Sequence, residues 1–281
     1  MKIAYLIRAH YAPAQLGRLV DRLDSENAAF FIHISARTSG GTLSKMQEAV
    51  GERANVQWVE RVATYYAGFS LVQSTLVGLR AIAAAEPTSH TVILSGQDYP
   101  ARPTPEIEKF LRQRPGESFV KYFALPAADE WPDEDGGLDR IRYRYFERVN
   151  YKTRTLRLPI LRRRFPQGLQ PYGGGAWCAL SDDAVRYITS FADQRPEVVD
   201  FFRHVKIPDE IFMQTVLLNS PLRDNVVGQE LHYIDWSRGG SHPKTLGTED
   251  YDSIVRSGKL FARKFDARYD MKILDMLDAR R

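Results

Sequence analysis

A pair of carboxylates follows a proline in the run Pro208-Asp209-Glu210. Proline fits the first turn of a helix, so Asp209 and Glu210 are predicted to lie near a helix N-terminus. The helix dipole favours an ionised carboxylate there, which is the form that a general base needs. An acidic residue in a first turn can also serve only to complement that dipole. Residue type and position therefore make Glu210 a candidate general base and leave the structural role open.

The chain contains one cysteine, Cys178, which cannot form an internal disulfide. A single thiol is typical of a protein from a reducing compartment. We interpret Cys178 as a small core residue rather than a nucleophile. No group of cysteines and histidines has the spacing of a zinc site, and the sequence predicts no bound metal.

Arginines and lysines interleaved with aromatic residues fill the segment from Arg140 to Arg164, directly after an acidic loop at 129–135. The surrounding region, 126–172, is interpreted as an insertion, because it is too short to hold a core of its own. The basic run could contact an anionic glycan or lipid-linked acceptor, or the anionic surface of a membrane. It could also be a solvated helix face, and nucleic acid is the least favoured partner.

The composition is that of an ordinary soluble globular protein, with 281 residues, 43% hydrophobic and 26% charged. No apolar run approaches the roughly 20 residues of a membrane span. The short apolar run at 1–9 is predicted to be the first strand rather than a signal peptide. A net charge of +4, without a recognition motif, argues against a nucleic-acid binder.

Apolar runs alternate with helical patterns along most of the chain, which predicts an α/β fold with a mostly parallel sheet. Expected strands are 3–7, 30–34, 56–62, 91–94, 119–123 and 233–236, and expected helices are 13–23, 71–85 with Ser70 as its N-cap, 182–191 and 209–218. Ligands of such sheets bind at the carboxyl ends of the strands. His10, Ser35 and the loop 95–100 are therefore the first candidates for a binding site.

Eight segments together resemble one known family and stand in the family's order along nearly the whole chain. They are the opening strand with His10 and Gln15, FFIHI at 30–34, GFSLVQ at 68–73, LSGQDYP at 94–100, GGGAW at 173–177, PDEIF at 208–212, GSHPK at 240–244 and LFARKFD at 260–266. The chain is thereby similar to the core-2/I-branching N-acetylglucosaminyltransferase and xylosyltransferase family, glycosyltransferase family 14.

The resemblance implies a single GT-A-type domain over 1–281, an α/β fold with a central, mostly parallel sheet flanked by helices. It also implies inverting transfer from a UDP-sugar without a required divalent metal, the UDP-sugar being a co-substrate and no cofactor being needed. Inversion is a single displacement in which the acceptor hydroxyl loses its proton as it attacks, and the resemblance assigns that general base to Glu210. Lys244 and Lys264 match the basic residues that hold the donor diphosphate, and Arg263 is a neighbouring possibility.

A metal-dependent enzyme of another GT-A type is an alternative reading. Many such enzymes hold the metal with an Asp-x-Asp motif, and Asp133-Glu134-Asp135 is the matching pattern here. Because this run lies in an acidic loop rich in proline and glycine, we interpret it as a solvated loop. Fixed cations would then stabilise the leaving diphosphate.

The nucleoside and the donor sugar are expected near His10, Ser35, Asp98 and Gly174. The family carries an acidic residue that contacts uridine where Ser35 stands, so this chain departs from the pattern there. Asp98 could lie at the sugar-binding edge or only stabilise its turn. Gly174, within the glycine run 173–175, would allow close approach of the backbone to a sugar, or only give a flexible loop.

Trp177 and Trp236 are candidate acceptor-binding residues, each with a place in the protein core as its alternative. Members of the family transfer N-acetylglucosamine, xylose or glucuronic acid, and the sequence does not choose among them. We expect a bacterial enzyme of surface polysaccharide synthesis, cytoplasmic or peripheral at the inner face of the membrane, because the anchor and the disulfide cysteines of Golgi members are missing. A non-catalytic glycan- or nucleotide-binding protein is the remaining alternative.

Overall fold

The structure, a computed structural model, describes residues 1–146, 162–240 and 242–280, together with the backbone of 156–158. Its main sheet has seven strands in the order β12-β6-β11-β4-β1-β2-β3. Pairing is parallel from β4 through β1 and β2 to β3 and between β12 and β6, whereas β11 is antiparallel to both neighbours. The strands are β1 (Lys2–Ala9), β2 (Ala28–Ile34), β3 (Val56–Trp58), β4 (Thr88–Ser95), β6 (Ser118–Phe119), β11 (Ala179–Ser181) and β12 (Val226–Val227).

Side chains of the central strand β1 alternate between two apolar cores. Ile3, Tyr5 and Ile7 belong to one core, and Ala4 and Leu6 belong to the other. Successive residues of a strand point to opposite faces of its sheet, so a strand buried on both faces is apolar throughout. This explains the unbroken apolar run at the start of the chain.

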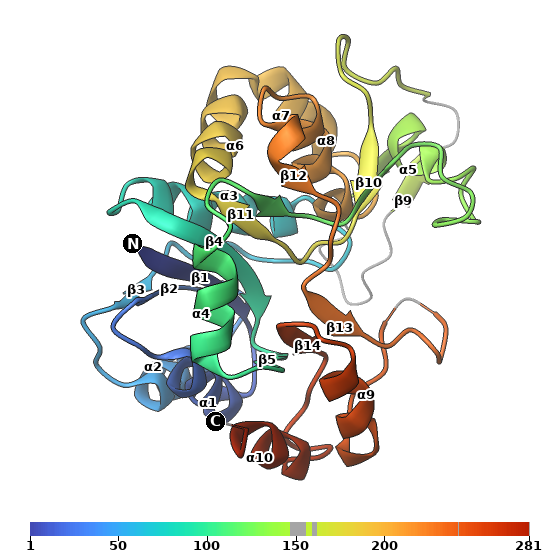
Figure 1. The fold of residues 1–281 in the computed structure, drawn as a ribbon. Helices are drawn as coiled ribbons and strands as arrows, with labels where there is room; N and C mark the ends of the chain where they lie inside the picture. The colour runs from blue at the N-terminus through green and yellow to red at the C-terminus, as the bar shows by residue number, and fades with distance from the viewer. Residues whose placement is uncertain (147–155, 159–161, 241, 281) are drawn as a thin grey trace.

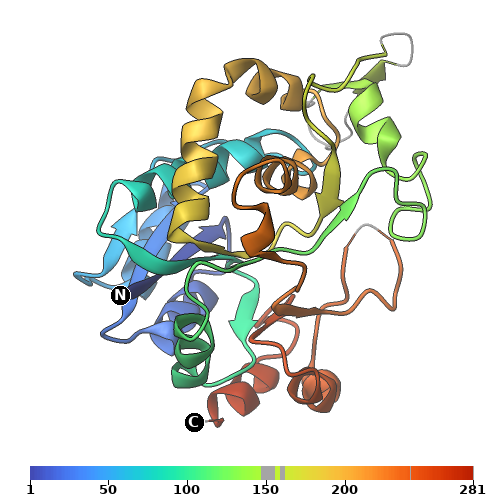
Figure 2. The ribbon, with the colours of Figure 1, turned by 45° about the horizontal axis from the view of Figure 1, so that its top comes forward.

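Helices cover both faces of this sheet (Figures 1 and 2). The core of Ile3 receives α1 (Pro13–Leu23), α2 (Gly40–Val50), α4 (Thr104–Arg112), α9 (Tyr251–Arg256) and α10 (Lys272–Asp278). The core of Ala4 receives α3 (Ser70–Ala83), α6 (Asp182–Gln194), α7 (Pro196–Phe202) and α8 (Phe212–Leu218). The helices hold the carboxyl ends of β1, β2 and β4 along one edge of the sheet.

Smaller elements flank that edge. One group is the three-stranded sheet of β13 (His232–Ile234), β14 (Phe261–Arg263) and β5 (Asp98–Pro100). The other comprises α5 (Leu138–Arg142) and the pairs of β7 (Tyr122–Ala124) with β10 (Tyr172–Gly174) and β8 (Arg144–Phe146) with β9 (Leu156–Leu158). Short 3₁₀ turns are η1 (Pro208–Glu210), η2 (Arg223–Asn225) and η3 (Thr248–Asp250). In Figure 1, β13, β14, α9 and α10 lie together at the bottom, whereas α5, β9 and β10 lie at the upper right.

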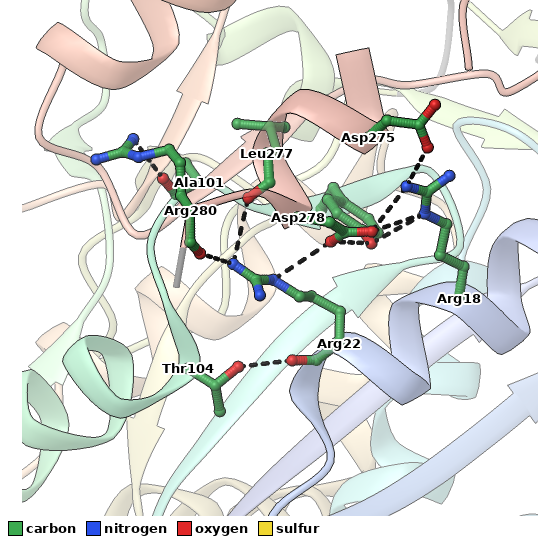
Figure 3. Close-up of polar contacts among 9 residues, drawn as sticks. Arg18, Arg22, Ala101, Thr104, Asp275, Leu277, Asp278 and Arg280 are labelled. Carbon is green, nitrogen blue, oxygen red and sulfur yellow. Dashed lines mark hydrogen bonds and ion pairs between the residues drawn. The ribbon is translucent and has the colours of Figure 1, made fainter. Parts of the chain in front are cut away.

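Ion pairs fasten the last helix to the first (Figure 3). Arg18 of α1 contacts Asp275 at 2.6 Å and Asp278 at 2.7 Å, and the hydroxyl of Tyr99 donates to Asp278 at 2.7 Å. Arg22 donates to the backbone carbonyls of Leu277 and Arg280. These contacts fix α10 and the residues after it against α1.

The structure confirms the predicted α/β class, with the central, mostly parallel sheet expected of a GT-A-type domain. The helix at 13–23 has the predicted bounds. The helix predicted at 209–218 is wrong in its first turn, because Ile211 has φ −132° and separates η1 from α8. Ser70 is the first residue of α3 and not its N-cap, since its hydroxyl accepts from the Tyr65 N–H instead. The strand predicted at 119–123 is split into β6 and β7.

Candidate active site

The strand ends place His10 and Ser35 near each other at the sheet edge. His10 follows β1, is exposed, and packs edge-on against the ring of Tyr11. Ser35 follows β2 and is 3% exposed, and its hydroxyl accepts from the backbone N–H groups of Arg37 and Thr64. The Ser35 hydroxyl therefore holds the loop at 61–64, while the His10 ring remains open to a ligand.

Asp98 is fully buried and lies against four polar groups, three of which donate hydrogen bonds to it. Its carboxylate accepts from the Ser95 N–H at 2.7 Å, the Ser95 hydroxyl at 2.8 Å and Arg263 at 3.0 Å, and His232 lies 3.7 Å away. Burial raises the pKa of this carboxyl, but Arg263 and His232 together hold the pKa below its ordinary value. Asp98 thus stabilises its turn and fixes Arg263, and it reaches a ligand only through that arginine.

Trp177 lies beneath two arginines. The guanidinium groups of Arg263 and Arg8 lie 3.9 Å and 5.2 Å from the centre of the ring, and the ring of His232 lies 6.1 Å away. Cation–π contacts of this kind orient the guanidinium planes. The half-buried Trp177 is consequently a support for the arginines within the fold.

The 3₁₀ turn η1 presents both carboxylates at the same edge. Glu210, whose side chain is 31% exposed, accepts a hydrogen bond from Arg140 at 3.0 Å. Burial and the neighbouring Asp209 raise the pKa of Glu210 to about 7, against a lowering by Arg140. Burial also raises the pKa of Asp209, and among the described residues its Oδ1 atom has no hydrogen-bond partner. Glu210 is thus poised between its charged and neutral forms near neutral pH.

Hydrogen bonds bring the segments of the two candidate lysines together. The Leu246 N–H donates to the Lys264 carbonyl at 2.9 Å, and the buried Gln15 amide ties the following residues to the loop after β4 by bonds to Gly96 and Phe265. Lys244 pairs with Asp250 at 2.6 Å and with Glu249 at 3.3 Å.

Lys264 is half-buried, and within the described part of the chain its ammonium group forms no ion pair or hydrogen bond, although Asp266 lies near enough to interact with its charge. An ammonium group outside an ion pair can bind an anion without first exchanging a carboxylate. Of the two lysines, Lys264 is therefore the one with its charge available, whereas an anion at Lys244 must compete with Asp250.

The loop before α3 touches both the carboxylate turn and the lysine segment. The Ala67 carbonyl accepts from the Ile207 N–H at 3.1 Å, one residue before η1. The ring of Tyr66 lies 5.1 Å from the ring of His242, in the segment of Lys244. This loop thereby contacts both the segment of Lys244 and the residue that precedes the turn of Glu210.

Gly174 and Trp236 lie on opposite sides of this arrangement. A Cβ atom at Gly174 would lie 1.9 Å from the carbonyl oxygen of Lys121, the residue before β7. Because β10 pairs with β7, only glycine fits at this position. Trp236 is 52% exposed and follows β13, where the Lys244 N–H donates to the neighbouring Asp235 carbonyl. Trp236 is thus accessible to an acceptor beside the lysine segment, whereas Gly174 is enclosed by protein.

The acidic loop at 133–135 is occupied by ion pairs. Asp135 pairs with Arg142, and Glu134 pairs with Arg140 and Lys206. Within the ranges that the structure describes, no three histidine, cysteine or acidic side chains form a group that could hold a metal ion. Cys178 is 2% exposed, and burial raises the pKa of its thiol to about 12, as expected of a core residue.

The basic run does not act as one surface. Arg163 is an internal brace that donates to the backbone carbonyls of Ile141, Tyr143, Phe201 and His204. Arg144, Arg162 and Arg164 are exposed. Arg148, Lys152 and Arg154 lie outside the described residues, as does the side chain of Arg157. No helix in the described ranges is long and apolar enough to cross a membrane.

Two site residues were not found from the sequence. Arg140 was placed within the basic run, but nothing local showed that it reaches Glu210. Glu230 is half-buried, and its carboxylate would lie 3.1 Å from a Cβ atom at Gly175, within the glycine run. Burial raises the pKa of Glu230. Only tertiary contact reveals either residue, although a lone acid just before an expected strand is a weak local hint for Glu230.

The sequence is similar to a known family and to several proteins of known name. A family model described as Core-2/I-Branching enzyme matches residues 3–255. Xylosyltransferase 1 of Canis lupus familiaris is 27% identical over 300 residues, which cover 99% of this chain and 30% of the relative. Xylosyltransferase 2 of Rattus norvegicus is 26% identical over 301 residues, covering 99% and 33%. This chain spans about a third of the length of these relatives.

Among solved structures, apo mouse xyloside xylosyltransferase 1 superposes with a TM-score of 0.41 and 11% identity, over 92% of this chain and 97% of that one.

Proposed function

The chain belongs to the Core-2/I-Branching enzyme family, and from that premise we propose that it is an inverting, metal-independent glycosyltransferase with a UDP-sugar donor. The observation that carries the proposal is Glu210. This carboxylate stands in the family's PDExF segment, at the edge where the parallel strands end, with a pKa of about 7. A carboxylate with a raised pKa is a stronger base than an ordinary one and is still partly ionised near neutral pH.

In the proposed reaction, Glu210 accepts the proton of the acceptor hydroxyl while that oxygen forms a bond to the anomeric carbon. The bond from the anomeric carbon to the diphosphate breaks in the same displacement, so the configuration inverts. Negative charge grows on the leaving UDP, where fixed cations stabilise it. We assign this role first to Lys264, which forms no ion pair, and second to Lys244, which must exchange Asp250 for the diphosphate.

The remaining assignments are proposals of the same kind. His10 is the open ligand group at the nucleoside end, and Ser35 and Asp98 act through the loop and the arginine that they hold. Trp236 is the acceptor contact. We further propose a bacterial enzyme of surface polysaccharide synthesis at the inner face of the membrane. The ion pairs of Glu134 and Asp135 support a mechanism in which this loop holds no metal.

Donor binding is the first test. Thermal unfolding is measured with UDP-xylose, UDP-N-acetylglucosamine and UDP-glucuronic acid, each with and without excess chelator. A ligand at about 100 times its Kd stabilises the folded state by about 2.7 kcal/mol. Stabilisation by one UDP-sugar that survives chelation supports the proposal. Stabilisation that requires manganese favours a metal-dependent enzyme, and no response to any UDP-sugar contradicts the assigned donor.

The catalytic step is tested with the donor found in this way. Glu210→Gln is expected to lower the release of UDP in the presence of acceptor by at least about 100-fold, while donor binding is retained. Lys264→Met should weaken donor binding by about 10-fold or more, and more than Lys244→Met does. Full transfer by Glu210→Gln would refute the general base, and Glu197→Gln, at an exposed carboxylate that pairs with Arg195, serves as the matched control.

A further inference from the structure

An aromatic platform lies behind the carboxylate turn. The ring of Trp131 is wedged between two glycines, because a Cβ atom would lie 2.3 Å from it at Gly137 and 2.6 Å from it at Gly173. Phe123 packs against the same ring edge-on, with 4.9 Å between the centroids. The indole ring is therefore confined, and neither glycine can gain a side chain without displacing it.

Arg140 rests on this platform and joins two carboxylates. Its guanidinium carbon lies 3.7 Å from the centre of the Trp131 ring. Nε donates to Glu134 at 2.7 Å, and Nη1 donates to Glu210 at 3.0 Å. Lys206 pairs with the other oxygen of Glu134, and its backbone N–H donates to the Arg140 carbonyl. The Arg140 side chain is 12% exposed. Its guanidinium is held by the Trp131 ring and by Glu134, and its backbone carbonyl is held by Lys206.

We propose that Arg140 is a positioning residue that holds the Glu210 carboxylate at a fixed point of the site and sets its charge through competition with Glu134. The proposal rests on the proposed function, in which Glu210 is the general base. A planar guanidinium presents its donors in a rigid fork and so binds two carboxylates in a fixed orientation, whereas a lysine ammonium contacts carboxylates as a point charge without that geometry. The glycine run at 173–175 then serves the base through Gly173, which makes room for the ring beneath Arg140.

The charged groups around Glu210 come from three elements. Asp209 lies beside it on η1, Arg140 reaches it from α5, and Glu134 approaches from the loop before α5. Asp209 and Glu134 raise the pKa of Glu210, whereas Arg140 lowers it. Removal of the Arg140 charge should therefore raise the pKa of Glu210, and removal of the Glu134 charge should lower it. A residue that serves only to stabilise the fold would give no such pair of opposite shifts.

The test measures the pKa of Glu210 in the full chain by NMR titration of isotope-labelled glutamate carboxyl carbons. The Glu210 signal is identified by its loss in Glu210→Gln. In Arg140→Met the pKa is expected to rise by about one unit or more, and in Glu134→Gln it is expected to fall by a smaller amount. Arg164→Met, which removes an exposed arginine of the same basic run, is the matched control and should leave the pKa of Glu210 unchanged.

Unchanged titration of Glu210 in both variants, or shifts in the same direction, would overturn the proposal. If Arg140→Met does not fold, Glu134→Gln alone decides by the sign of its shift. With the donor identified above, the acidic limb of kcat/KM against pH should move with the NMR value. Loss of transfer in Glu210→Gln without these shifts would refute only the role of Arg140. Shifts with undiminished transfer in Glu210→Gln would refute the general base and leave the electrostatic coupling standing.

Discussion

Two arginine–carboxylate pairs, Arg263 with Asp98 and Arg140 with Glu210, contain the same chemical groups at the same distance of 3.0 Å. The two carboxylates differ in their burial and in the direction of their pKa shifts. Asp98 is fully buried, accepts additional bonds from Ser95, and has a pKa below its ordinary value. Glu210 is 31% exposed, lies beside Asp209, and has a pKa raised to about 7.

The comparison teaches that an arginine alone does not decide the charge of its partner. Asp98 accepts hydrogen bonds from Arg263 and the Ser95 N–H and lies beside the His232 ring, and these groups together outweigh the cost of burial. Glu210 shares its arginine with Glu134 and has another acid as its neighbour, so burial prevails. One pair is consequently a permanent ion pair of the fold, and the other is set for proton exchange.

The largest expected effect is on the buried pair. Asp98→Asn removes the charge that compensates Arg263 and should lower the free energy of unfolding by about 3–5 kcal/mol at neutral pH. Chemical denaturation measures this change. Because the pKa of Asp98 is lowered in the fold, its contribution is present above its ordinary pKa of 3.8 and is lost as the pH falls further. A loss that is equally large in strong acid would contradict a charged Asp98.

Gly173→Ala should disturb the Arg140–Glu210 pair and leave the Arg263–Asp98 pair intact. The new Cβ atom would lie 2.6 Å from Trp131 and 2.7 Å from Phe123, an overpacking that costs about 1–3 kcal/mol. Thermal unfolding and the Glu210 titration are measured together. We expect the pKa of Glu210 to change as Trp131 moves beneath Arg140. A stability loss without any change in the pKa of Glu210 would show that Gly173 does not act on Glu210 through Arg140.

Glu210→Gln should change the free energy of unfolding in the opposite direction to Asp98→Asn. Between the ordinary pKa of 4.5 and the folded value of about 7, the unfolded chain loses its proton first, so the wild type becomes less stable as the pH rises. The uncharged glutamine escapes this loss and should be more stable than the wild type by about 1 kcal/mol at about pH 8, discounted for partial exposure. Below pH 4.5, the wild type and Glu210→Gln should have the same free energy of unfolding. Denaturation at both pH values checks the sign.

The smallest effect is expected at an exposed carboxylate. Glu249, 56% exposed, pairs with Lys244 at 3.3 Å. Exposed ion pairs contribute about 0–1 kcal/mol, so Glu249→Gln should change the free energy of unfolding by less than about 0.5 kcal/mol. A larger loss would mean that Lys244 is held more firmly than its contacts with Asp250 and Glu249 indicate.

Periodicity and motif order were sufficient for the α/β class, for the helix at 13–23 and for the carboxyl-edge location of His10 and Ser35. They were sufficient because a strand buried on both faces and an amphipathic helix have patterns that nearest neighbours in the sequence define. The break at Ile211 has no such pattern, since it depends on a local backbone conformation between η1 and α8.

Side-chain partners were beyond the reach of sequence reasoning. Arg140 and Arg163 stand in the same basic run, yet one binds a carboxylate 70 positions away and the other binds four backbone carbonyls. Lys244 and Lys264 were assigned the same role, but only one is paired with acids. The motif identifies such residues, and tertiary contacts determine their charge.

Cys178, buried with a thiol pKa of about 12, has a practical consequence for measurements on this protein. Thiol reagents attack the thiolate of accessible cysteines, so the native chain should resist maleimide while it remains folded. A cysteine introduced at the exposed Arg238, two residues after Trp236, would then carry a fluorophore at one defined position. Emission from that label could follow acceptor arrival in real time, without removal of the natural cysteine.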